Sequence, residues 1–315
     1  MSEILADFLV RKPEGYYCRY GDFYVDAMQP VRVNVVSHAH GDHASNGHGK
    51  IYGTAATIAF MQHRYTKQPL STFEMIGFNQ SFILGEVMLT FIAAGHILGS
   101  AQILMEYRGI RYLYTGDYKM DEDPTCEPLM VVQADVLITE STFAHPDTQH
   151  PNAVDEILKL KNRPSNILLG CYALGKAQRI TALLNEYCPE RRVLVHHNIT
   201  PFHRIYDKLG FAPLTYEPYN RQAMKQGEPN KVYLVPPMTF NNYFRATKVL
   251  RAFASGWKRL QQHNDIALYI SDHVDWEDIV GYVAKVKPKQ IWTIHGEGRH
   301  LKEYYTGQME VRDIY

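Results

Sequence analysis

The chain has 315 residues, of which 45% are hydrophobic, and this length is comfortable for two domains with substantial cores. No stretch reaches the eighteen or so apolar residues of a membrane span, and the N-terminus lacks the basic segment of a secretory leader. The formal net charge is zero, but residues 146–267 contain 17 Lys and Arg against 9 Asp and Glu. This basic part fits a polyanionic partner, and a solvated lysine-rich surface is the alternative explanation.

In chain order, the first 140 residues predict a β-rich domain with short connections. Strand-like segments, rich in β-branched and aromatic residues, lie at 23–25, 33–36, 87–92, 102–107 and 111–115. A helix is predicted at 55–64. Arg108-Gly109, between the last two strands, predicts a tight hairpin turn.

From about residue 146 the pattern changes to alternating helices and strands. Helices are expected at 153–161 and 176–187 and strands at 166–169 and 193–196, which is typical of βαβ units and a parallel sheet. Strands at 266–270 and 290–294 then flank a helix at 276–285. We therefore predict a discontinuous domain made of residues 1–145 and 268–315, interrupted by an α/β domain at 146–267.

The four cysteines, Cys18, Cys126, Cys171 and Cys188, are scattered along the chain and form no C-x-x-C pair. Such spacing suits buried thiols in a reducing compartment and argues against a disulfide scaffold. We expect a cytoplasmic protein.

The most informative stretch is the run from His38 to His43, His-Ala-His-Gly-Asp-His, directly after an apolar strand-like segment. Three imidazoles and the carboxylate of Asp42 would converge where that strand ends. Neutral imidazole and carboxylate are ligands that a divalent ion such as zinc prefers. The alternative is a His-rich surface loop that binds no metal. The complete pattern H-x-H-x-D-H after a strand favours a metal site.

Two further polar residues follow strands and can complete this group. His96 opens a turn that contains Gly99 and Ser100, and Asp117 ends the segment Thr115-Gly116-Asp117. Either residue alone would more often be a turn residue or a satisfied core group. Their spacing after the histidine run raises the odds that they are metal ligands.

Taken in order, these motifs resemble the metallo-β-lactamase fold, and Asp26 matches the acidic residue upstream of the histidine run in that family. Three later segments, 138–142, 271–273 and 294–297, resemble the additional motifs of the β-CASP nucleases. The resemblance covers nearly the whole chain. It implies an α/β fold, namely an αβ/βα sandwich of metallo-β-lactamase type with an inserted β-CASP α/β domain.

The resemblance also implies residue roles in metal-dependent hydrolysis of a phosphodiester. Two divalent ions, zinc or alternatively manganese, would activate the attacking water. The implied ligands are His38, His40 and His96 for one ion, Asp42, His43 and His295 for the other, and Asp117 between them, with Asp42 also counted as catalytic. His273 would act as the general acid and Glu140 would orient it. The alternative for Glu140 and His273 is a structural pair at the boundary of the insertion.

Several further stretches, among them 13–18, 21–26 and 123–126, resemble the bacterial exonucleases that are encoded beside ATP-dependent DNA ligases. This finer resemblance implies a DNA exonuclease in DNA repair, associated with a DNA ligase and a helicase and with no membrane partner. His295 leaves RNA open as the substrate, because RNA-processing members of the wider family carry this histidine while DNA-acting eukaryotic members tend to lack it. An RNA-processing nuclease and a non-catalytic nucleic-acid-binding subunit are the alternatives.

One motif imitates a nucleotide site. Residues 170–177 nearly match the phosphate-binding loop G-x-x-x-x-G-K-[ST], but Ala177 lacks the hydroxyl that would hold magnesium. We therefore do not expect nucleotide hydrolysis. A helix that begins beside Lys176 and Arg179 could still bind a phosphate of nucleic acid, and Ser100 is the third residue predicted to contact the polymer.

Overall fold

The computed structural model describes residues 3–211, 213–220, 222, 228–242, 248–296 and 298–314. The chain divides into two compact units. The first unit comprises Met1–Glu122, Cys126–Gln149 and His273–Tyr315, and the second comprises Asp123–Thr125 and His150–Asp272. The division falls at 149/150 and 272/273, within about five residues of the boundaries expected at 145/146 and 267/268.

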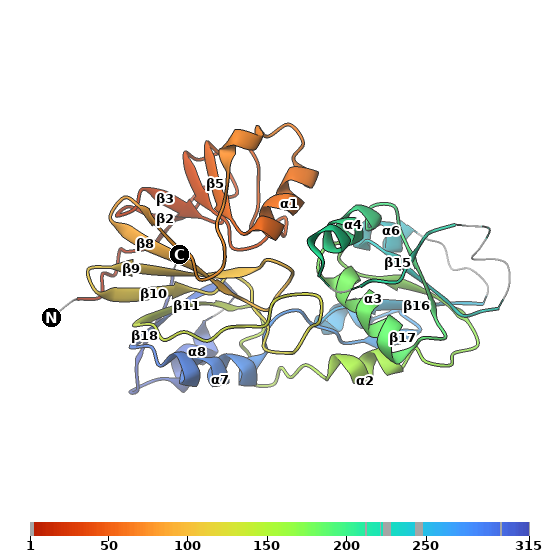
Figure 1. Cartoon of the computed structure of the whole chain (residues 1–315). Helices are drawn as coiled ribbons and strands as arrows, with labels where there is room; N and C mark the ends of the chain where they lie inside the picture. The colour runs from red at the N-terminus through yellow and green to blue at the C-terminus, as the bar shows by residue number, and fades with distance from the viewer. Residues whose placement is uncertain are drawn as a thin grey trace. The chain divides into compact units, whose positions relative to one another are not determined.

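The first unit contains two sheets and the helices that cover them (Figure 1). The first sheet has the order β1 (Val10–Lys12), β2 (Gly15–Cys18), β3 (Phe23–Val25), β4 (Val33–Val35), β5 (Lys50–Gly53), β6 (Phe73–Met75). The second has the order β19 (Glu310–Asp313), β18 (Gln290–Gly296), β11 (Val136–Ser141), β10 (Ile110–Tyr114), β9 (Ala101–Tyr107), β8 (Val87–Ala93), β7 (Ser81–Leu84). The helices are α1 (Ala55–Arg64), the short 3₁₀ helix η1 (Leu70–Thr72), α7 (Trp276–Val286) and α8 (Arg299–Tyr304).

Alternation along the strands explains why these sheets stack. Successive side chains of a strand point to opposite faces, and Val136 and Ile138 of β11 join the core shared with Val25 and Val35 of the first sheet. Leu137, between them, joins the core under α7 instead. The second sheet is therefore buried on both faces, against the first sheet on one side and against α7 on the other.

The tight turn predicted between β9 and β10 is confirmed. Arg108 and Gly109 both have positive φ, 49° and 77°, and Ile110 pairs with Tyr107 across the hairpin. Two consecutive residues with positive φ are the requirement of the turn type whose twist matches the flanking strands.

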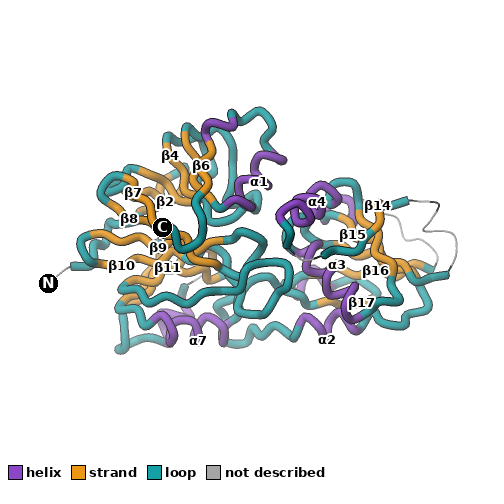
Figure 2. Tube along the Cα trace, in the orientation of Figure 1, coloured by secondary structure: helices purple, strands orange, loops and turns teal. Residues whose placement is uncertain are grey.

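The second unit is built around one parallel sheet, whose strands Figure 2 colours orange. Its order is β14 (Glu217–Pro218), β13 (Arg192–Val195), β15 (Lys231–Val235), β12 (Asn166–Gly170), β16 (Val249–Ala254), β17 (Ile266–Leu268). Every pairing between neighbouring strands is parallel. The helices in the described part of this unit are α2 (Ala153–Leu158), α3 (Lys176–Tyr187), α4 (Thr200–Leu209), α6 (Pro237–Asn242) and the 3₁₀ helix η2 (Lys258–Gln261).

The two faces of this sheet are covered by different helices. Ile167 and Leu169 of β12 pack with Leu184 of α3 and Ile157 of α2. Leu168, on the opposite face, packs with Phe240 of α6 and with Phe253. Strands buried on both faces between helices are the normal arrangement of a parallel sheet.

The predicted fold class, an α/β sandwich with an inserted α/β domain, is confirmed by these two units. The predicted bounds of α1 and α3 are also confirmed. None of the helices in the described ranges is long and apolar enough to cross a membrane.

Candidate metal centre

The candidate ligands lie at one edge of the second sheet of the first unit. Strands β10, β11 and β18 run parallel to one another, and β8 runs parallel to β10 because both are antiparallel to β9. Their carboxyl ends therefore share one edge, and this edge carries His96 after β8, Asp117 after β10, Glu140 on β11 and His295 on β18.

The histidine run comes to the same edge from the first sheet. It follows β4, and the backbone N–H of Ala101, at the start of β9, donates to the carbonyl of Ser37 over 2.8 Å. Asp26 supports the run from β3. Its carboxylate accepts from the backbone N–H and the hydroxyl of Ser37 over 2.7 and 2.6 Å. The loop between residues 36 and 44 is thus fixed at its base.

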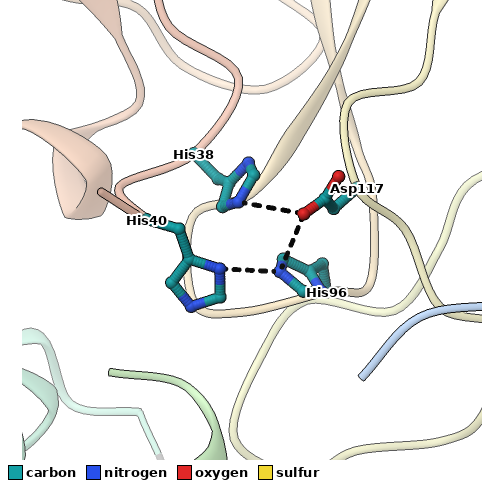
Figure 3. A group of neighbouring side chains, drawn as sticks. All are labelled: His38, His40, His96 and Asp117. Carbon is teal, nitrogen blue, oxygen red and sulfur yellow. Dashed lines mark hydrogen bonds and ion pairs between the residues drawn. The ribbon is translucent and has the colours of Figure 1, made fainter. Parts of the chain in front are cut away.

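Four of the expected ligands form one compact group (Figure 3). The ligand atoms of His38, His40, His96 and Asp117 all lie within 4.8 Å of one another. Asp117 Oδ2 is 3.6 Å from His38 Nε2 and 3.8 Å from His96 Nε2, and His96 Nε2 is 3.0 Å from His40 Nδ1. Three imidazoles and one carboxylate around a common point match the ligand set of a zinc-like ion.

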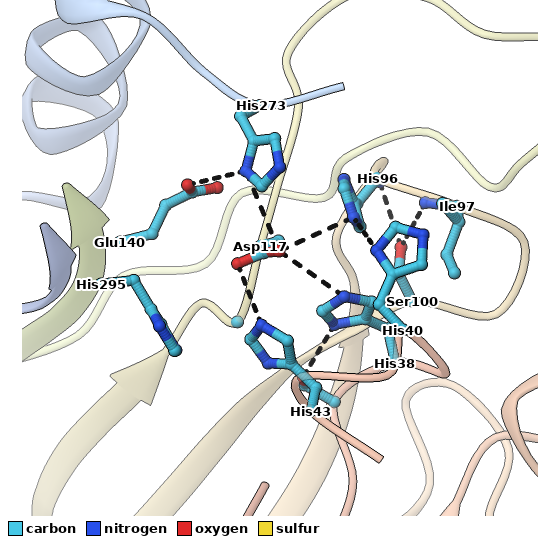
Figure 4. Close-up of polar contacts among 12 residues, drawn as sticks. His38, His40, His43, His96, Ile97, Ser100, Asp117, Glu140, His273 and His295 are labelled. Atoms are coloured by element: carbon cyan, nitrogen blue, oxygen red, sulfur yellow. Dashed lines mark hydrogen bonds and ion pairs between the residues drawn. The ribbon is translucent and has the colours of Figure 1, made fainter. Parts of the chain in front are cut away.

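His43 and His295 form the neighbouring group expected for the second ion. Nε2 of His43 is 3.4 Å from Asp117 Oδ1, and the rings of His43 and His295 are 4.9 Å apart. Nδ1 of His43 is 2.8 Å from Oδ2 of Asp26. Asp117 therefore directs one oxygen toward each group (Figure 4), and Asp26 orients His43 from behind, as carboxylates behind metal-bound histidines commonly do.

Asp42 lies differently from the other expected ligands. Asp42 is exposed, whereas His38, His43, His96 and Asp117 are buried. Among the described residues, the clusters that could hold an ion consist of His38, His40, His96 and Asp117 in one case and Asp117, Glu140 and His273 in the other. The role predicted for Asp42 stays a prediction.

The electrostatics of the group favour the metal-binding protonation states of His38 and Asp117, but not that of His43. Burial and the neighbouring His43 hold the pKa of His38 well below its ordinary value. Burial opposes ionisation of Asp117, but His43 and His273 outweigh burial and hold the pKa of Asp117 well below its usual range. Burial opposes protonation of His43, but Asp117 and Asp26 outweigh burial and hold the pKa of His43 well above its usual range. A cation that binds His43 must therefore displace a proton, because protonated ligands must first lose their protons.

Two buried nitrogens provide a direct test of whether a cation fits here. Nε2 of His38 and Nε2 of His295 are buried and have no hydrogen-bond partner among the residues that the structure describes. Buried polar atoms in native proteins are nearly always satisfied, and each exception needs an explanation. One unsatisfied nitrogen lies in each group, beside Asp117, and a metal ion at each position would satisfy both. The His38 group therefore fits a divalent ion, and the nitrogen of His295 is the observation that supports a second position.

Glu140 and His273 form a second feature at the same edge. Glu140 is fully buried, its Oε1 accepts from the backbone N–H of Tyr118 over 3.0 Å, and its Oε2 is 2.9 Å from His273 Nδ1. The His273 side chain is 27% exposed, and Nδ1 is 3.9 Å from Asp117 Oδ2. The imidazole is therefore held by a rigid buried carboxylate, next to the ligand group and in reach of solvent.

Several residues that the sequence did not single out hold the ligand loops in place. Arg64, at the end of α1, donates to the carbonyl of Ala39 over 2.8 Å, and the hydroxyl of Tyr65 donates to the carbonyl of Ala44 over 2.6 Å. At the start of α1, Thr54 and Thr57 both donate to the carbonyl of Gly99 over 2.6 and 3.1 Å. Helix α1 thus supports both the histidine run and the His96 turn.

The three predicted contacts with nucleic acid are corrected by the structure. Ser100 is buried, and its hydroxyl accepts from the backbone N–H groups of His96 and Ile97 over 3.1 and 3.2 Å, so it shapes the His96 turn. Lys176 and Arg179 are 3% and 2% exposed. Both are paired with Asp272, over 3.0 and 3.1 Å. Buried cations already neutralised by a carboxylate do not present their charge to a phosphate.

Comparison with known proteins gives relatives, although no family model matches the chain. A protein named "Probable DNA ligase" from Opitutus terrae is 29% identical over 304 residues, which cover 91% of this chain and 29% of that protein. "Endoribonuclease ysh1" from Aspergillus fumigatus is 32% identical over 202 residues, 51% of this chain and 23% of that enzyme. "RNase J-like protein" from Methanocaldococcus jannaschii is 24% identical and covers 94% of this chain and 87% of its own length.

These relatives point to the metallo-β-lactamase/β-CASP nucleases as the family that the chain resembles. The chain spans less than a third of the length of the ligase-named protein and of the fungal endoribonuclease. A solved structure of a protein of unknown function from Enterococcus faecalis V583 has the same fold, with a TM-score of 0.61 over 89% of this chain and 78% of that one, at 15% identity.

Proposed function

We propose that the chain is a metal-dependent phosphodiesterase that cleaves nucleic acid, and within that class an exonuclease that acts on DNA during repair. The observation that carries the proposal is the placement of a buried carboxylate–imidazole pair beside a histidine/aspartate ligand group at a single sheet edge. Hydrolysis of a phosphodiester needs a polarised phosphoryl oxygen, an attacking water and a proton for the departing alcohol. The two features together can supply all three.

In this proposal, His38, His40 and His96 would hold one divalent ion, Asp42, His43 and His295 would hold a second, and Asp117 would reach both. When bound, such ions would supply Lewis acidity for the phosphoryl oxygens and lower the pKa of the attacking water. Zinc suits the imidazole-rich set, and manganese is the alternative. With two divalent ions bound, the carboxylates of Asp42 and Asp117 would neutralise only part of the charge of the ions, and the remaining positive charge would attract a phosphate.

His273 supplies the proton for the leaving oxygen. An alkoxide is a poor leaving group, so a positioned acid contributes on the order of 10²–10⁴-fold to the rate. The contact with Glu140 occupies Nδ1, and the proton that is transferred therefore comes from Nε2, on the other edge of the ring. Glu140 stabilises the imidazolium before transfer, and the backbone N–H of Tyr118 keeps the carboxylate in position.

The choice of DNA rests on the alignment that covers 91% of this chain, with the Opitutus protein named "Probable DNA ligase". A DNA ligase, and a helicase with it, are accordingly the partners we propose. RNA cleavage is the second candidate, favoured by the names of the fungal endoribonuclease and the archaeal RNase J-like protein and by the presence of His295.

The test is to incubate the metal-loaded protein with end-labelled single-stranded DNA and RNA of the same sequence, with His40→Ala as the control. Stepwise shortening of DNA that the control lacks supports the proposal. Preferential cleavage of RNA would move the function to RNA processing. A wild-type protein that binds metal and both polymers but cuts neither would leave the role of a non-catalytic binding subunit.

A further inference from the structure

The second unit presents a row of exposed side chains along one edge of its parallel sheet. Because all six strands run in the same direction, their carboxyl ends meet at one edge, which is where ligands of open α/β sheets bind. The connections after four neighbouring strands each expose a side chain there. These are His197 after β13, Met238 after β15, Tyr172 after β12 and Trp257 after β16, the last three being 81%, 50% and 40% exposed.

Tyr172 and Trp257 follow adjacent strands. Gly170 pairs with Phe253 at the end of the β12–β16 ladder, so Tyr172 lies two residues beyond this pair on one strand and Trp257 lies four residues beyond it on the other. Neighbouring strands are only about 4.8 Å apart. Two large aromatic rings are therefore exposed on neighbouring connections of the same edge.

The turn that carries Trp257 is firmly held. The backbone N–H of Trp257 donates to Ser255 Oγ over 3.1 Å, and its carbonyl accepts from the N–H of Leu260 over 3.1 Å. Gln261 donates to the carbonyls of Ser255 and Leu268 over 3.1 and 3.0 Å. Because the backbone of this turn is held by hydrogen bonds, little conformational entropy is lost when a ligand stacks on the exposed indole. The exposed ring is therefore suited to binding.

The turn that carries Tyr172 is fixed in a comparable way. The carbonyl of Tyr172 accepts from the N–H of Ala177 over 3.1 Å. The side chain of Gln178 bridges the turn, because it accepts from the N–H of Gly175 over 2.7 Å and donates to the carbonyl of Ala173 over 3.1 Å. The backbone contacts settle the path of the turn, and the phenol ring is left half-exposed.

Charge indicates what these rings would meet. Many cations of this unit are engaged internally, as Lys176 and Arg179 are, but Lys258 and Arg259 directly follow Trp257 and are exposed. The Arg259 guanidinium carbon lies 5.3 Å from the centre of the Trp257 ring. Aromatic rings interleaved with exposed cations suit a single-stranded nucleic acid, whose bases stack on the rings while its phosphates meet the cations. A duplex hides the faces of its bases.

We propose that the carboxyl edge of the second unit's sheet is a stacking platform for single-stranded nucleic acid, with Tyr172 and Trp257 as the rings and Lys258 and Arg259 as the phosphate contacts. The proposal rests on the function proposed above, and it names the form of polymer that the protein grips. The platform recognises base faces and phosphates, which DNA and RNA share.

The test is binding of fluorescein-labelled oligo(dT) and oligo(U) to the full chain, measured by anisotropy in the His40→Ala background so that the probe is not cut. Trp257→Ala and Tyr172→Ala should each weaken binding by roughly 5- to 100-fold, the usual range for one lost base stack. Trp257→Phe should restore most of the loss. Tyr304→Ala is the matched control, since Tyr304 is also 50% exposed but belongs to the first unit.

Salt dependence and fluorescence separate the two kinds of contact. Lys258→Gln and Arg259→Gln should each reduce the slope of log affinity against log salt by roughly 0.7, whereas the aromatic variants should leave the slope unchanged. Of the three tryptophans, Trp276 and Trp292 are 7% and 0% exposed. Quenching of intrinsic fluorescence by the bases should therefore come from Trp257 and disappear in Trp257→Phe.

Equal affinity for an abasic strand of the same phosphate number, equal affinity for duplex DNA, or quenching that persists in Trp257→Phe would overturn the platform. The nuclease proposal fails separately. Loss of binding in Trp257→Ala together with a wild-type protein that cuts nothing would support the platform and remove the nuclease. Normal cleavage and normal binding by both aromatic variants would support the nuclease and remove the platform.

Discussion

Replacing Asp26 with asparagine tests whether this buried carboxylate supports the metal centre or only the fold. Asp26 is 4% exposed. Its Oδ1 faces the N–H of Ser37 at 2.7 Å, and its Oδ2 faces the Ser37 hydroxyl, His43 Nδ1 and the Tyr114 hydroxyl at 2.6, 2.8 and 2.9 Å. An amide has one oxygen and one NH₂ group, so either orientation of the substituted side chain points a donor at a donor. With the amide oxygen in the place of Oδ2, the loss is limited to the Ser37 N–H.

One buried donor left without its acceptor costs about 1–3 kcal/mol, and we expect the metal-free protein to lose about that much free energy of unfolding in urea. His43 would also lose the negative charge behind its ring, so metal affinity should fall by about 10- to 100-fold. Affinity is measured by competition with a chromophoric chelator. Tyr114→Phe is the control, because it removes one donor to Asp26 and leaves the contact with His43. An Asp26→Asn protein that is destabilised but binds metal as tightly as wild type would refute the supporting role of Asp26.

Three further predictions concern the acid, the loop support and the pH dependence of stability. His273→Ala should keep its metal content, measured by atomic emission, and lose about 10²–10⁴-fold in turnover; loss of metal would show that His273 is a ligand. Arg64→Ala, which releases the Ala39 carbonyl, should weaken metal binding by about 5- to 30-fold, seen as faster transfer to a chelator, while Lys67→Ala, an exposed neighbour, should not. Burial, and then Asp275 and Asp121, raise the pKa of Asp278 to about 6. Because folding raises this pKa, the carboxyl stabilises the folded protein when the pH is below the unfolded pKa of 3.8. This contribution is lost as the pH rises through about 6. Asp278→Asn should therefore gain about 1–2 kcal/mol over wild type at pH 8, after discounting for partial exposure, and the gain should vanish below about pH 4; a constant gain would contradict the assigned cause.

Local chemistry sets the ends of two elements that the sequence predicts correctly. Helix α1 begins where the Thr54 side chain accepts from the N–H of Thr57, and Arg108-Gly109 supplies the positive φ that its hairpin turn needs. Short strands such as β6 and β7, of three and four residues, were missed. Their existence depends on pairing with β5 and β8, which a local pattern does not contain.

The same distinction holds at the metal centre. The structure gathers His38, His40, His96 and Asp117 as expected from motifs, since each follows or ends a strand and strand ends converge. The supports from Arg64, Tyr65, Thr54 and Thr57 could not be predicted. Their acceptors are backbone carbonyls, which every residue has, so the sequence carries no mark of which carbonyl is used.

Lys176 and Arg179 show how one sequence pattern can have two physical explanations. Cations at the start of a helix after a strand suit an external phosphate, and they suit an internal carboxylate equally well. The carboxylate that decides the matter, Asp272, lies 93 residues after Arg179, and Asp123 is a second one, 3.5 Å from the Arg179 Nε. Two buried cations and two carboxylates neutralise one another, whereas removing either side would leave a buried charge unpaired at a cost of several kcal/mol. Lys258 and Arg259 are exposed instead, so their charge can reach a phosphate beside the Trp257 turn.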